Sequence, residues 1–446
     1  MTDSTLWPAE RQDLESHWLP FTDNKTFKEG PRLITRAAGV ELWNHRGERV
    51  LDAASGLFTS AAGHCRQEIA DAVSAQLMQL DYMPSFLRSH PKSFEAANKL
   101  VNILPEPLDH VFFCNSGSEA VDTAMKMALA YHLARGEGQR NVFVSRDRAY
   151  HGVNFGGTAL AGIVRNRQDY ASALPSVVHM RATTREEDRF HRGQAAGGEE
   201  LADDLLRAVQ THGAKRIAAC FVEPIAGSTG VLVPPEQYLP RLREICDEYG
   251  ILLVFDEVIT GFGRTGSAFG AHSFGVTPDI MTMAKALTNG AIPMGAVACQ
   301  SGIYDAVVDS YPDYAVEFAH GYTYSAHPVA CAAAVATLDI YENDKLFDRA
   351  GHIAPGFLDR MFALRNIPGV TDVRGYGMLV GIDVETRGAP GARGHLLQRM
   401  LFDAGLHLKT TGDAAIVAPA LVMQEAELDE TAEILAETLK RLAQTP

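Results

Sequence analysis

The sequence predicts an α/β protein: one large, mostly parallel sheet of the seven-stranded type, and a smaller α+β domain built from both chain ends. Three observations carry this prediction. Between about residues 66 and 330, short apolar runs alternate with helical segments. These runs are apolar throughout, as in strands that are buried on both faces. Outside this region the pattern changes to strands with alternating polarity and to strand pairs joined at glycines.

The expected elements follow in chain order. Residues 30–60 alternate apolar and polar positions, which predicts a short antiparallel meander. The expected strands of the large sheet are 110–115, 141–147, 216–224 and 251–257, and the expected helices are 119–136, 200–213 and 238–250. Toward the C-terminus we expect strands in 369–385 and 413–422 and a final helix over 427–443. The predicted domain limits are 1–65 and 331–446 for the smaller domain and 66–330 for the larger one.

Two polar segments are expected to be loops, namely 185–200 and 388–395. The first is long enough to be a functional insertion, although a surface excursion is the favoured interpretation.

Composition excludes several classes of protein. Apolar residues make up 46% and charged residues 21% of the chain, as in an ordinary globular enzyme. A formal charge of −15 argues against nucleic acid or an anionic membrane as the main partner. No segment approaches 18 uninterrupted apolar residues, so no membrane span is expected. Residues 1–16 are polar and acidic, unlike a signal peptide, and a cytoplasmic location is therefore expected.

The cysteines and histidines predict neither disulfides nor a metal site. The 16 histidines show no HExxH or comparable ligand spacing. The six cysteines contain no CxxC pair and are interpreted as small hydrophobic residues in a reducing compartment; they are Cys65, Cys114, Cys220, Cys246, Cys299 and Cys331.

Asp256 and Lys285 are the most informative pair in the chain, because each ends or follows an apolar run that predicts a buried strand. Side chains at the carboxyl ends of such strands face a shared crevice, where open α/β sheets bind ligands. A carboxylate and an amine delivered there match the needs of pyridoxal phosphate, which uses a lysine for its Schiff base and an acid for its pyridine nitrogen. Alone, Lys285 would be a surface lysine, but its apolar neighbours disfavour that interpretation.

The turn NSGSE at 115–119 precedes a strong helix and is a candidate phosphate site. Ser116 and Glu119 have the spacing of a capping box, and Gly117 allows close approach of a ligand to the backbone. Free amides at a helix start bind anions. Taken alone, such a turn is more often a plain helix cap, but its position after a buried strand of the same sheet as Asp256 favours phosphate binding.

Two further residues follow predicted strands at the same edge. Tyr150 could place its ring against a flat heterocycle, although a lone tyrosine there is more often structural. Glu223 ends the next strand, and a carboxylate in that position favours a polar site over core packing.

Nucleotide-binding motifs offer no competing explanation. The chain contains no GxxxxGK[ST] sequence, so a P-loop is excluded. GFGRTG at 261–266 matches GxGxxG, but it lies beyond the strand and no helical periodicity follows it. A dinucleotide fingerprint links strand to helix directly, so we interpret this match as coincidental.

Together, NSGSE, YHG, VEP, DEVITGFGRTG, TMAKALTNG and GYTYSAHP resemble the class III pyridoxal-phosphate aminotransferases across nearly the whole chain. HWLPFTDNK, SAAGH and HGYTYSAHP are most similar to the ω-amino acid (β-alanine):pyruvate group. The resemblance implies fold type I and a homodimer, or a tetramer made of two such dimers, with shared active sites. It also implies a ping-pong transfer from an ω- or β-amino acid or a primary amine to pyruvate.

The resemblance implies residue roles as well. Lys285 would bind the cofactor covalently, Asp256 would pair with the pyridine nitrogen, and Tyr150 would stack on the ring. Val258 would pack on the opposite ring face, and Thr323 would reach the phosphate from the partner subunit. The other implied cofactor contacts are Ser116, Gly117, Ser118, His151, Glu223 and Tyr322. The implied substrate contacts are Phe21, Leu57, Phe58, Phe86, Tyr150 and Lys409.

Three positions depart from the family pattern. Lys409 stands where close relatives usually carry an arginine for the substrate carboxylate, and lysine lacks the bidentate fork. Phe58 replaces a tryptophan of the pocket wall, and Ile259 replaces a polar residue of some members. These changes leave the donor open. The sequence also leaves open a decarboxylating enzyme or an aminomutase on the same fold, whereas intact Lys285 and Asp256 argue against a non-catalytic protein.

Overall fold

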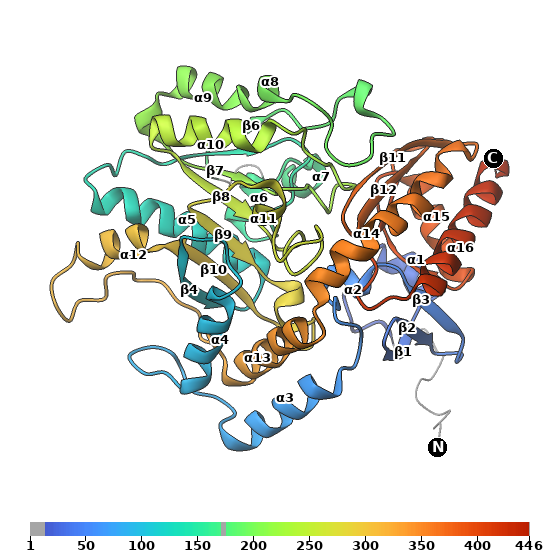
Figure 1. Ribbon diagram of the computed structural model, residues 1–446, viewed down its shortest axis with the longest axis horizontal. Coiled ribbons are helices and arrows are strands. Elements are labelled where there is room, and N and C mark those ends of the chain that lie inside the picture. Colours follow the sequence, from blue (N-terminus) through green and yellow to red (C-terminus); the bar gives the residue numbers. More distant parts are fainter. Residues whose placement is uncertain (1–13, 171–174, 446) are drawn as a thin grey trace.

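The computed structural model describes residues 14–170 and 175–445, so most of the segment 1–16, which the sequence analysis found unlike a signal peptide, lies outside it. A seven-stranded sheet forms the centre of the molecule (Figure 1). Its order is β4-β10-β9-β8-β7-β5-β6, and only β10 runs antiparallel to its neighbours. The bounds are β4 Leu108–Cys114, β5 Val142–Arg146, β6 Val177–Met180, β7 Ile217–Val222, β8 Leu252–Asp256, β9 Ile280–Met283 and β10 Gly295–Gln300. The predicted large, mostly parallel sheet is confirmed.

Helices bury both faces of this sheet. Leu253 and Phe255 of β8 pack in the core that contains α10 (Tyr238–Tyr249), whereas Val254 packs in the core that contains α5 (Gly117–Ala134). This division follows because successive side chains of a strand point to opposite faces. The other helices of this part are α3 Gln67–Gln79, α4 Pro91–Val101, α6 Phe155–Leu160, α7 Val164–Arg167, α8 Glu199–Ala202, α9 Asp204–His212, α11 Gly270–Phe274, α12 Ser301–Val308 and α13 Pro328–Asn343.

The two chain ends meet in a four-stranded sheet, β1-β2-β3-β13. The expected meander is present as β1 (Ile34–Ala38), β2 (Glu41–Asn44) and β3 (Arg49–Asp52), paired antiparallel. Parallel pairing then adds β13 (Leu406–His407) to β3. The limits of the domains stay a prediction.

A second four-stranded sheet, β11-β12-β15-β14, is antiparallel throughout. Its strands are β11 Val370–Tyr376, β12 Leu379–Val384, β14 Lys409–Thr411 and β15 Ala414–Val417. The remaining helices are α1 Asn24–Glu29, α2 Ser55–Phe58, α14 Leu346–Phe362, α15 Ala392–Asp403 and α16 Glu425–Gln444. The expectation of a loop over 388–395 holds only to Gly391, because α15 begins at Ala392. The expected loop at 185–200 holds only to Gly198, because α8 begins at Glu199, and it contains a short 3₁₀ turn at Glu186–Asp188. A bridge between Arg192 and Gly375 joins it to β11.

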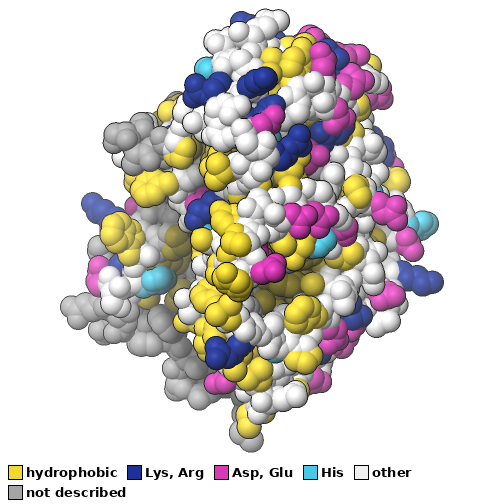
Figure 2. Space-filling view, turned by 90° about the vertical axis from the view of Figure 1, so that its left-hand side faces the viewer, with side chains coloured by type: hydrophobic (Ala, Val, Ile, Leu, Met, Phe, Trp, Pro, Cys, Tyr) yellow, Lys and Arg dark blue, Asp and Glu magenta, His cyan; other side chains and the backbone are white. Residues whose placement is uncertain are grey.

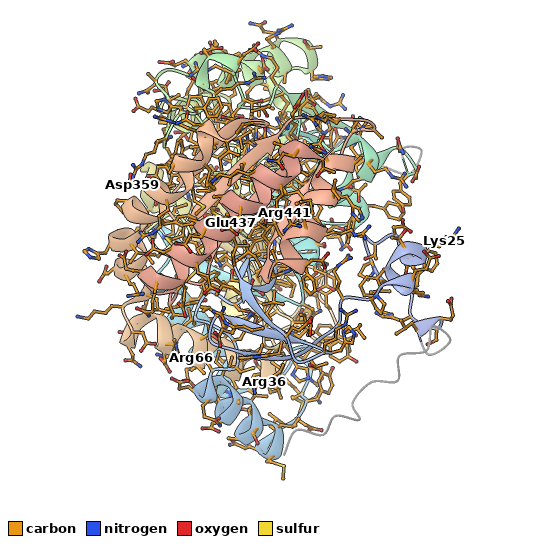
Figure 3. All side chains as sticks on the ribbon, turned by 90° about the vertical axis from the view of Figure 1, so that its right-hand side faces the viewer. Lys25, Arg36, Arg66, Asp359, Glu437 and Arg441 are labelled. Carbon is orange, nitrogen blue, oxygen red and sulfur yellow. The ribbon has the colours of Figure 1, made fainter. Side chains whose placement is uncertain are left out.

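The surface differs between the two ends of the molecule. Hydrophobic side chains gather in a band on the side that lies at the left of Figure 1, where α12 projects (Figure 2). At the opposite end, charged residues such as Asp359 of α14 and Glu437 of α16 face outward (Figure 3). No helix within 14–170 and 175–445 combines the length and the hydropathy of a membrane span.

The same residues contain no cluster of three His, Cys, Asp or Glu side chains arranged to hold a metal. All six cysteines are free; five are buried, as expected for small hydrophobic residues, and Cys65 is exposed.

Candidate active site

A cavity of about 330 Å³ lies at the carboxyl ends of β7, β8 and β9. The strands deliver side chains to one edge of the sheet, as parallel strands do. The predicted residues that line the cavity are Ser116, Gly117, Ser118, Tyr150, His151, Glu223, Asp256, Val258 and Lys285.

Asp256 is the last residue of β8 and is 5% exposed. Its Oδ2 pairs with Nδ1 of His151 at 2.8 Å, and its Oδ1 accepts a hydrogen bond from the amide of Val258 at 3.1 Å. These two contacts fix the carboxylate within the cavity wall. A fixed, buried carboxylate can stabilise a positive charge on a bound ligand.

Lys285 opens a short 3₁₀ turn after β9, with φ of 48°. Burial lowers its pKa from 10.5 to about 8, against the opposing effects of Asp256 and Glu223. A lysine with such a pKa is partly neutral near neutral pH, and the neutral amine is the nucleophilic form. Lys285 can therefore react with a carbonyl group held in this cavity.

Glu223 lies directly after β7 and is buried. Its carboxylate accepts hydrogen bonds from the amides of Tyr150 at 3.0 Å and Gly227 at 3.1 Å. Burial, together with the charge of Asp256, raises the pKa of Glu223. Burial also raises the pKa of Tyr150, so its hydroxyl stays protonated. Glu223 thus ties the segment that follows β5 to the segment that follows β7.

The first turn of α5 forms another wall of the cavity. The hydroxyl of Ser116 accepts a hydrogen bond from the backbone amide of Glu119 at 3.1 Å. The carboxylate of Glu119 in turn accepts one from the backbone amide of Asn115 at 2.7 Å. Gly117 has no side chain, so a ligand can approach its backbone closely. A Cβ at this position would lie only 3.1 Å from the methyl groups of Val258. A helix start that faces a cavity suits an anion such as a phosphate.

The expected substrate contacts are more dispersed. Phe58 is 1% exposed, and its ring centre lies 5.7 Å from Nζ of Lys285. Lys409 begins β14; burial lowers its pKa, and its charge acts on Lys285. Phe58 and Lys409 nevertheless lie outside the lining of the cavity. Phe21, Leu57 and Phe86 do not line it in the single chain either, and they are 78%, 50% and 51% exposed.

Tyr322 and Thr323 also lie outside this cavity. The hydroxyl of Tyr322 contacts the carbonyl of Glu119 at 3.3 Å, so this side chain packs on α5. Thr323 is exposed, and its carbonyl accepts a hydrogen bond from Tyr82 at 2.9 Å. Their expected contacts with a cofactor remain predictions, and that of Thr323 concerns a partner subunit.

Sequence reasoning missed several lining residues, namely Thr59, Thr288, Gly290, Ile292, Pro293 and Met294. The NG pair after Lys285 signals a turn, but no sequence pattern signalled Thr59. Glu257, next to Asp256, was also overlooked; burial raises its pKa to about 7. Its carboxylate accepts the amides of Gly270 at 2.8 Å and Ala271 at 2.7 Å, which indicates a structural role.

Comparisons with known proteins agree with this geometry. Residues 24–439 match the family model described as aminotransferase class-III. The chain is 48% identical to an omega-aminotransferase of Caulobacter vibrioides, covering 96% of this chain and 97% of the relative. It is 46% identical to a beta-alanine–pyruvate aminotransferase of Pseudomonas aeruginosa, covering 97% of each.

Solved structures give the same result. An (S)-enantioselective omega-transaminase from Thermomicrobium roseum matches with a TM-score of 0.91 and 34% identity over 97% of both chains. The omega transaminase from Pseudomonas jessenii in complex with PMP matches with a TM-score of 0.91 and 30% identity, covering 97% of this chain and 98% of that one.

The cavity fits the cofactor of that family. It brings together an amine of lowered pKa, a buried carboxylate, an aromatic side chain and a helix start, which are the groups that pyridoxal phosphate requires. The absence of a side chain at Gly117 leaves space for the ligand next to Val258; a Cβ there would contact the methyl groups of Val258. The chain therefore belongs to the class III aminotransferases, and its cofactor is pyridoxal 5′-phosphate.

Proposed function

We propose that this protein is an ω-aminotransferase that moves an amino group from an ω-amino acid, a β-amino acid or a primary amine to pyruvate. The convergence of Lys285, Asp256 and Tyr150 in one cavity carries the transamination chemistry. The choice of substrates is supported by the relatives named beta-alanine–pyruvate and omega-amino acid–pyruvate aminotransferase, at 46% and 45% identity.

When bound, pyridoxal phosphate supplies an electron sink next to the carbon that carries the amino group. Asp256, held by His151, balances the positive charge of a protonated pyridine nitrogen. Lys285 would bind the cofactor covalently, and its amine, when free, would take and return the proton of the substrate carbon. The donor product leaves before the acceptor binds, which gives ping-pong kinetics.

The substrate side provides one charge and one apolar wall. We propose that the ammonium of Lys409 binds the carboxylate of the acceptor, as a point charge rather than a bidentate fork. Phe58 lies beside Lys285 and would bound the space for the donor side chain. Tyr150 would stack on the cofactor ring, Val258 would pack on the other face, and the amides of Gly117 and Ser118 would bind the phosphate.

We also propose that the active form is a homodimer with shared active sites. Two observations support it. Leu57 and Phe86 are exposed in the single chain, as is Leu87 at 93%, and clusters of large exposed apolar residues mark interfaces. Thr323 is exposed as well, which suits a contact with the phosphate of a partner subunit.

A cytoplasmic location is part of the proposal and is supported by six free cysteines.

A panel of amino donors read through the visible spectrum of the cofactor tests the function. β-Alanine, γ-aminobutyrate, ornithine, aspartate and a simple aralkylamine are each added to the holoenzyme without acceptor, and pyruvate is then added with an assay for alanine. We expect a spectral change with an ω- or β-amino acid or an amine, followed by alanine formation. Release of carbon dioxide, or product without pyruvate, would instead indicate a decarboxylating enzyme or an aminomutase.

A further inference from the structure

The segment Ser55–Phe58 on the substrate side has an unusual backbone. Ser55 and Phe58 have φ of 44° and 62° although neither is glycine, and Gly56 between them has φ of 68°. Left-handed conformations of non-glycine residues persist only where the surroundings enforce them. The next residue, Thr59, lines the cavity. Whatever enforces this backbone therefore also fixes the cavity wall.

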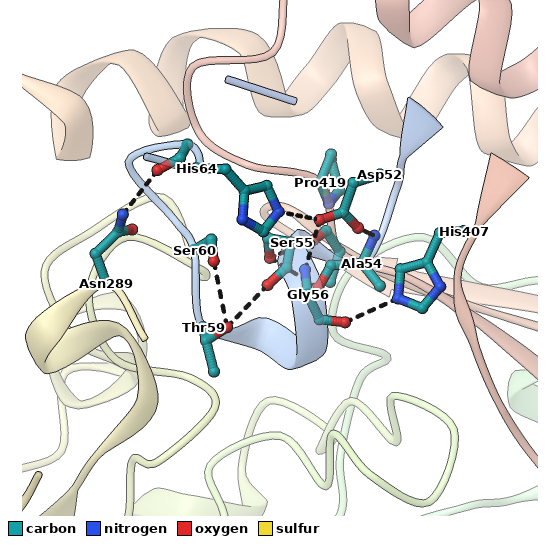
Figure 4. A network of polar contacts seen from close by, with 12 residues as sticks. Asp52, Ala54, Ser55, Gly56, Thr59, Ser60, His64, Asn289, His407 and Pro419 are labelled. Atoms are coloured by element: carbon teal, nitrogen blue, oxygen red, sulfur yellow. Dashed lines mark hydrogen bonds and ion pairs between the residues drawn. The ribbon is translucent and has the colours of Figure 1, made fainter. Parts of the chain in front are cut away.

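Asp52, which is buried, holds the segment from one side (Figure 4). Its Oδ1 accepts the amide of Ala54 at 3.0 Å, and its Oδ2 accepts the amide of Gly56 at 2.6 Å. The same Oδ2 pairs with Nε2 of His64 at 2.7 Å. Nε2 of His407 lies 3.0 Å from the carbonyl oxygen of Gly56. Both backbone polar groups of Gly56 are thus held by side chains.

Arg264 holds the segment from the other side. Its guanidinium is fully buried and donates hydrogen bonds to the hydroxyl of Ser55 and to the carbonyl of Pro419. Within the described part of the chain, Arg264 forms no ion pair and its Nε has no hydrogen-bond partner. Burial lowers its pKa to about 10, and the charge of Asp52 acts against this effect. A guanidinium buried without a paired carboxylate is costly, which favours a specific role for this one.

The held segment is in direct contact with the reactive lysine. The ring centre of Phe58 lies 5.7 Å from Nζ of Lys285. Thr59 packs against Gly290, where an added Cβ would lie 2.8 Å from Cβ of Thr59. Asn289, in the turn that Lys285 opens, binds two backbone groups of the chain just after Thr59, at 2.9 and 2.7 Å. A shift of the segment therefore changes the space beside the amine.

We propose that Arg264 and Asp52 act as a positioning pair that holds Ser55–Phe58 in its unusual backbone conformation, with positive φ at Ser55, Gly56 and Phe58, and thereby sets the donor side chains that the cavity accepts. The inference rests on the proposed function, because it treats Phe58 as the boundary of the donor space. It also gives a role to the GFGRTG segment. Its arginine, Arg264, holds the segment next to the cavity wall, whereas the same motif in other proteins binds a dinucleotide.

The test compares a small and a bulky donor in the first half-reaction of the holoenzyme. Ser55→Ala removes the hydroxyl that Arg264 binds, and Arg264→Lys keeps the charge but loses the fork that reaches two acceptors. We expect the ratio of second-order rate constants for an aralkylamine and β-alanine to change by about fivefold or more in both variants. The visible spectrum of the cofactor should stay unchanged, and its Kd should stay within about twofold.

Arg349→Lys is the matched control. The guanidinium of Arg349 donates to the carbonyls of Leu421 and Met423, both at 2.8 Å, close in sequence to Pro419 but not to the Ser55–Phe58 segment. This variant should leave the donor ratio unchanged even if its stability falls. If Arg264→Lys fails to fold, Ser55→Ala decides the outcome alone.

An unchanged donor ratio in Ser55→Ala, or equal losses with both donors, overturns the positioning role. The proposed function is judged separately on the unmodified enzyme, by the formation of alanine from pyruvate. If that fails, the donor comparison still proceeds with a small and a bulky amine that change the cofactor spectrum.

Discussion

The cofactor side and the substrate side of the cavity are assembled in different ways. On the cofactor side, Asp256, Lys285 and Glu223 each end or directly follow a strand of one sheet. The proposed substrate side would be formed by Phe58 and Lys409, which lie outside the cavity lining of the single chain and come from segments near opposite ends of the sequence. The positions of the residues on the first side follow from the order of the strands alone, because parallel strands present their carboxyl ends at one edge of the sheet. The second depends on packing between distant segments and, as proposed, on a second subunit.

Loss of the lysine should produce the largest effect. Lys285→Ala removes the amine that we propose binds the cofactor and moves the proton, and we expect turnover to fall by about 10²–10⁴-fold or more. Alanine formation measures the loss, and borohydride reduction followed by peptide mapping measures attachment at position 285. Lys409→Ala serves as the control, since it removes a lysine from the substrate side only. Full turnover in Lys285→Ala would contradict the cofactor assignment.

Asp256→Asn should have the next largest effect. The amide keeps the shape of the side chain but cannot balance a protonated pyridine nitrogen, so kcat should fall by about 10²–10³-fold. Asp279→Asn is the matched control, because Asp279 is also largely buried and accepts the amide of Leu253 at 2.7 Å, away from the cavity. That control should lower stability without changing the activity of the folded enzyme. Equal kcat values for the two variants would argue against the role of Asp256.

The substrate side should be sensitive to subunit association. Phe86→Glu places a charge on an exposed apolar residue, and we expect it to weaken the homodimer and reduce activity with it. Sedimentation measures the oligomeric state across a range of protein concentrations. Leu133→Glu changes another exposed apolar residue, on α5, and should leave association intact. A Phe86→Glu enzyme that remains dimeric would remove this residue from the interface.

Lys409 should have a smaller effect that is confined to the charged substrate. Lys409→Ala should raise KM for pyruvate by roughly fivefold, since a partly exposed ion pair contributes up to about 1 kcal/mol. KM for an uncharged amine donor should change much less, and Lys409→Arg should restore or improve acceptor binding. Steady-state kinetics with both substrates measure the difference. Equal changes for donor and acceptor would place Lys409 outside the substrate pocket.

The smallest expected effect is a pH dependence on the cofactor side. Because the pKa of Lys285 is about 8, the rate of cofactor attachment to the apoenzyme should rise with pH around a midpoint near 8. The unfolded chain still binds this proton up to its ordinary pKa of 10.5, so the apoenzyme should gain stability between about pH 8 and 10.5. Denaturant titrations of the apoenzyme and of Lys285→Ala measure this gain as their difference. A midpoint near 10.5 would show that the amine is not desolvated.

Much of the sheet could be predicted from local patterns. The fully apolar runs before Asp256 and Lys285 indicated strands buried on both faces, and they are β8 and β9. The turn at Ser116 follows β4 and opens α5 as expected. The loop predicted at 388–395 was wrong by a few residues at its C-terminal end. The glycines within this polar segment do not prevent α15 from beginning at Ala392.

The sequence by itself determined the fold class and the strand-end residues that form the cofactor side, because strand, turn and helix follow one another along the chain. Only the tertiary structure decided the opposite wall, where Arg264 reaches Ser55 and Thr59 packs against Gly290. Those contacts join residues far apart in sequence, and no periodicity or motif encodes such a meeting. Their geometry depends on how the packed sheets and helices bring the two segments together.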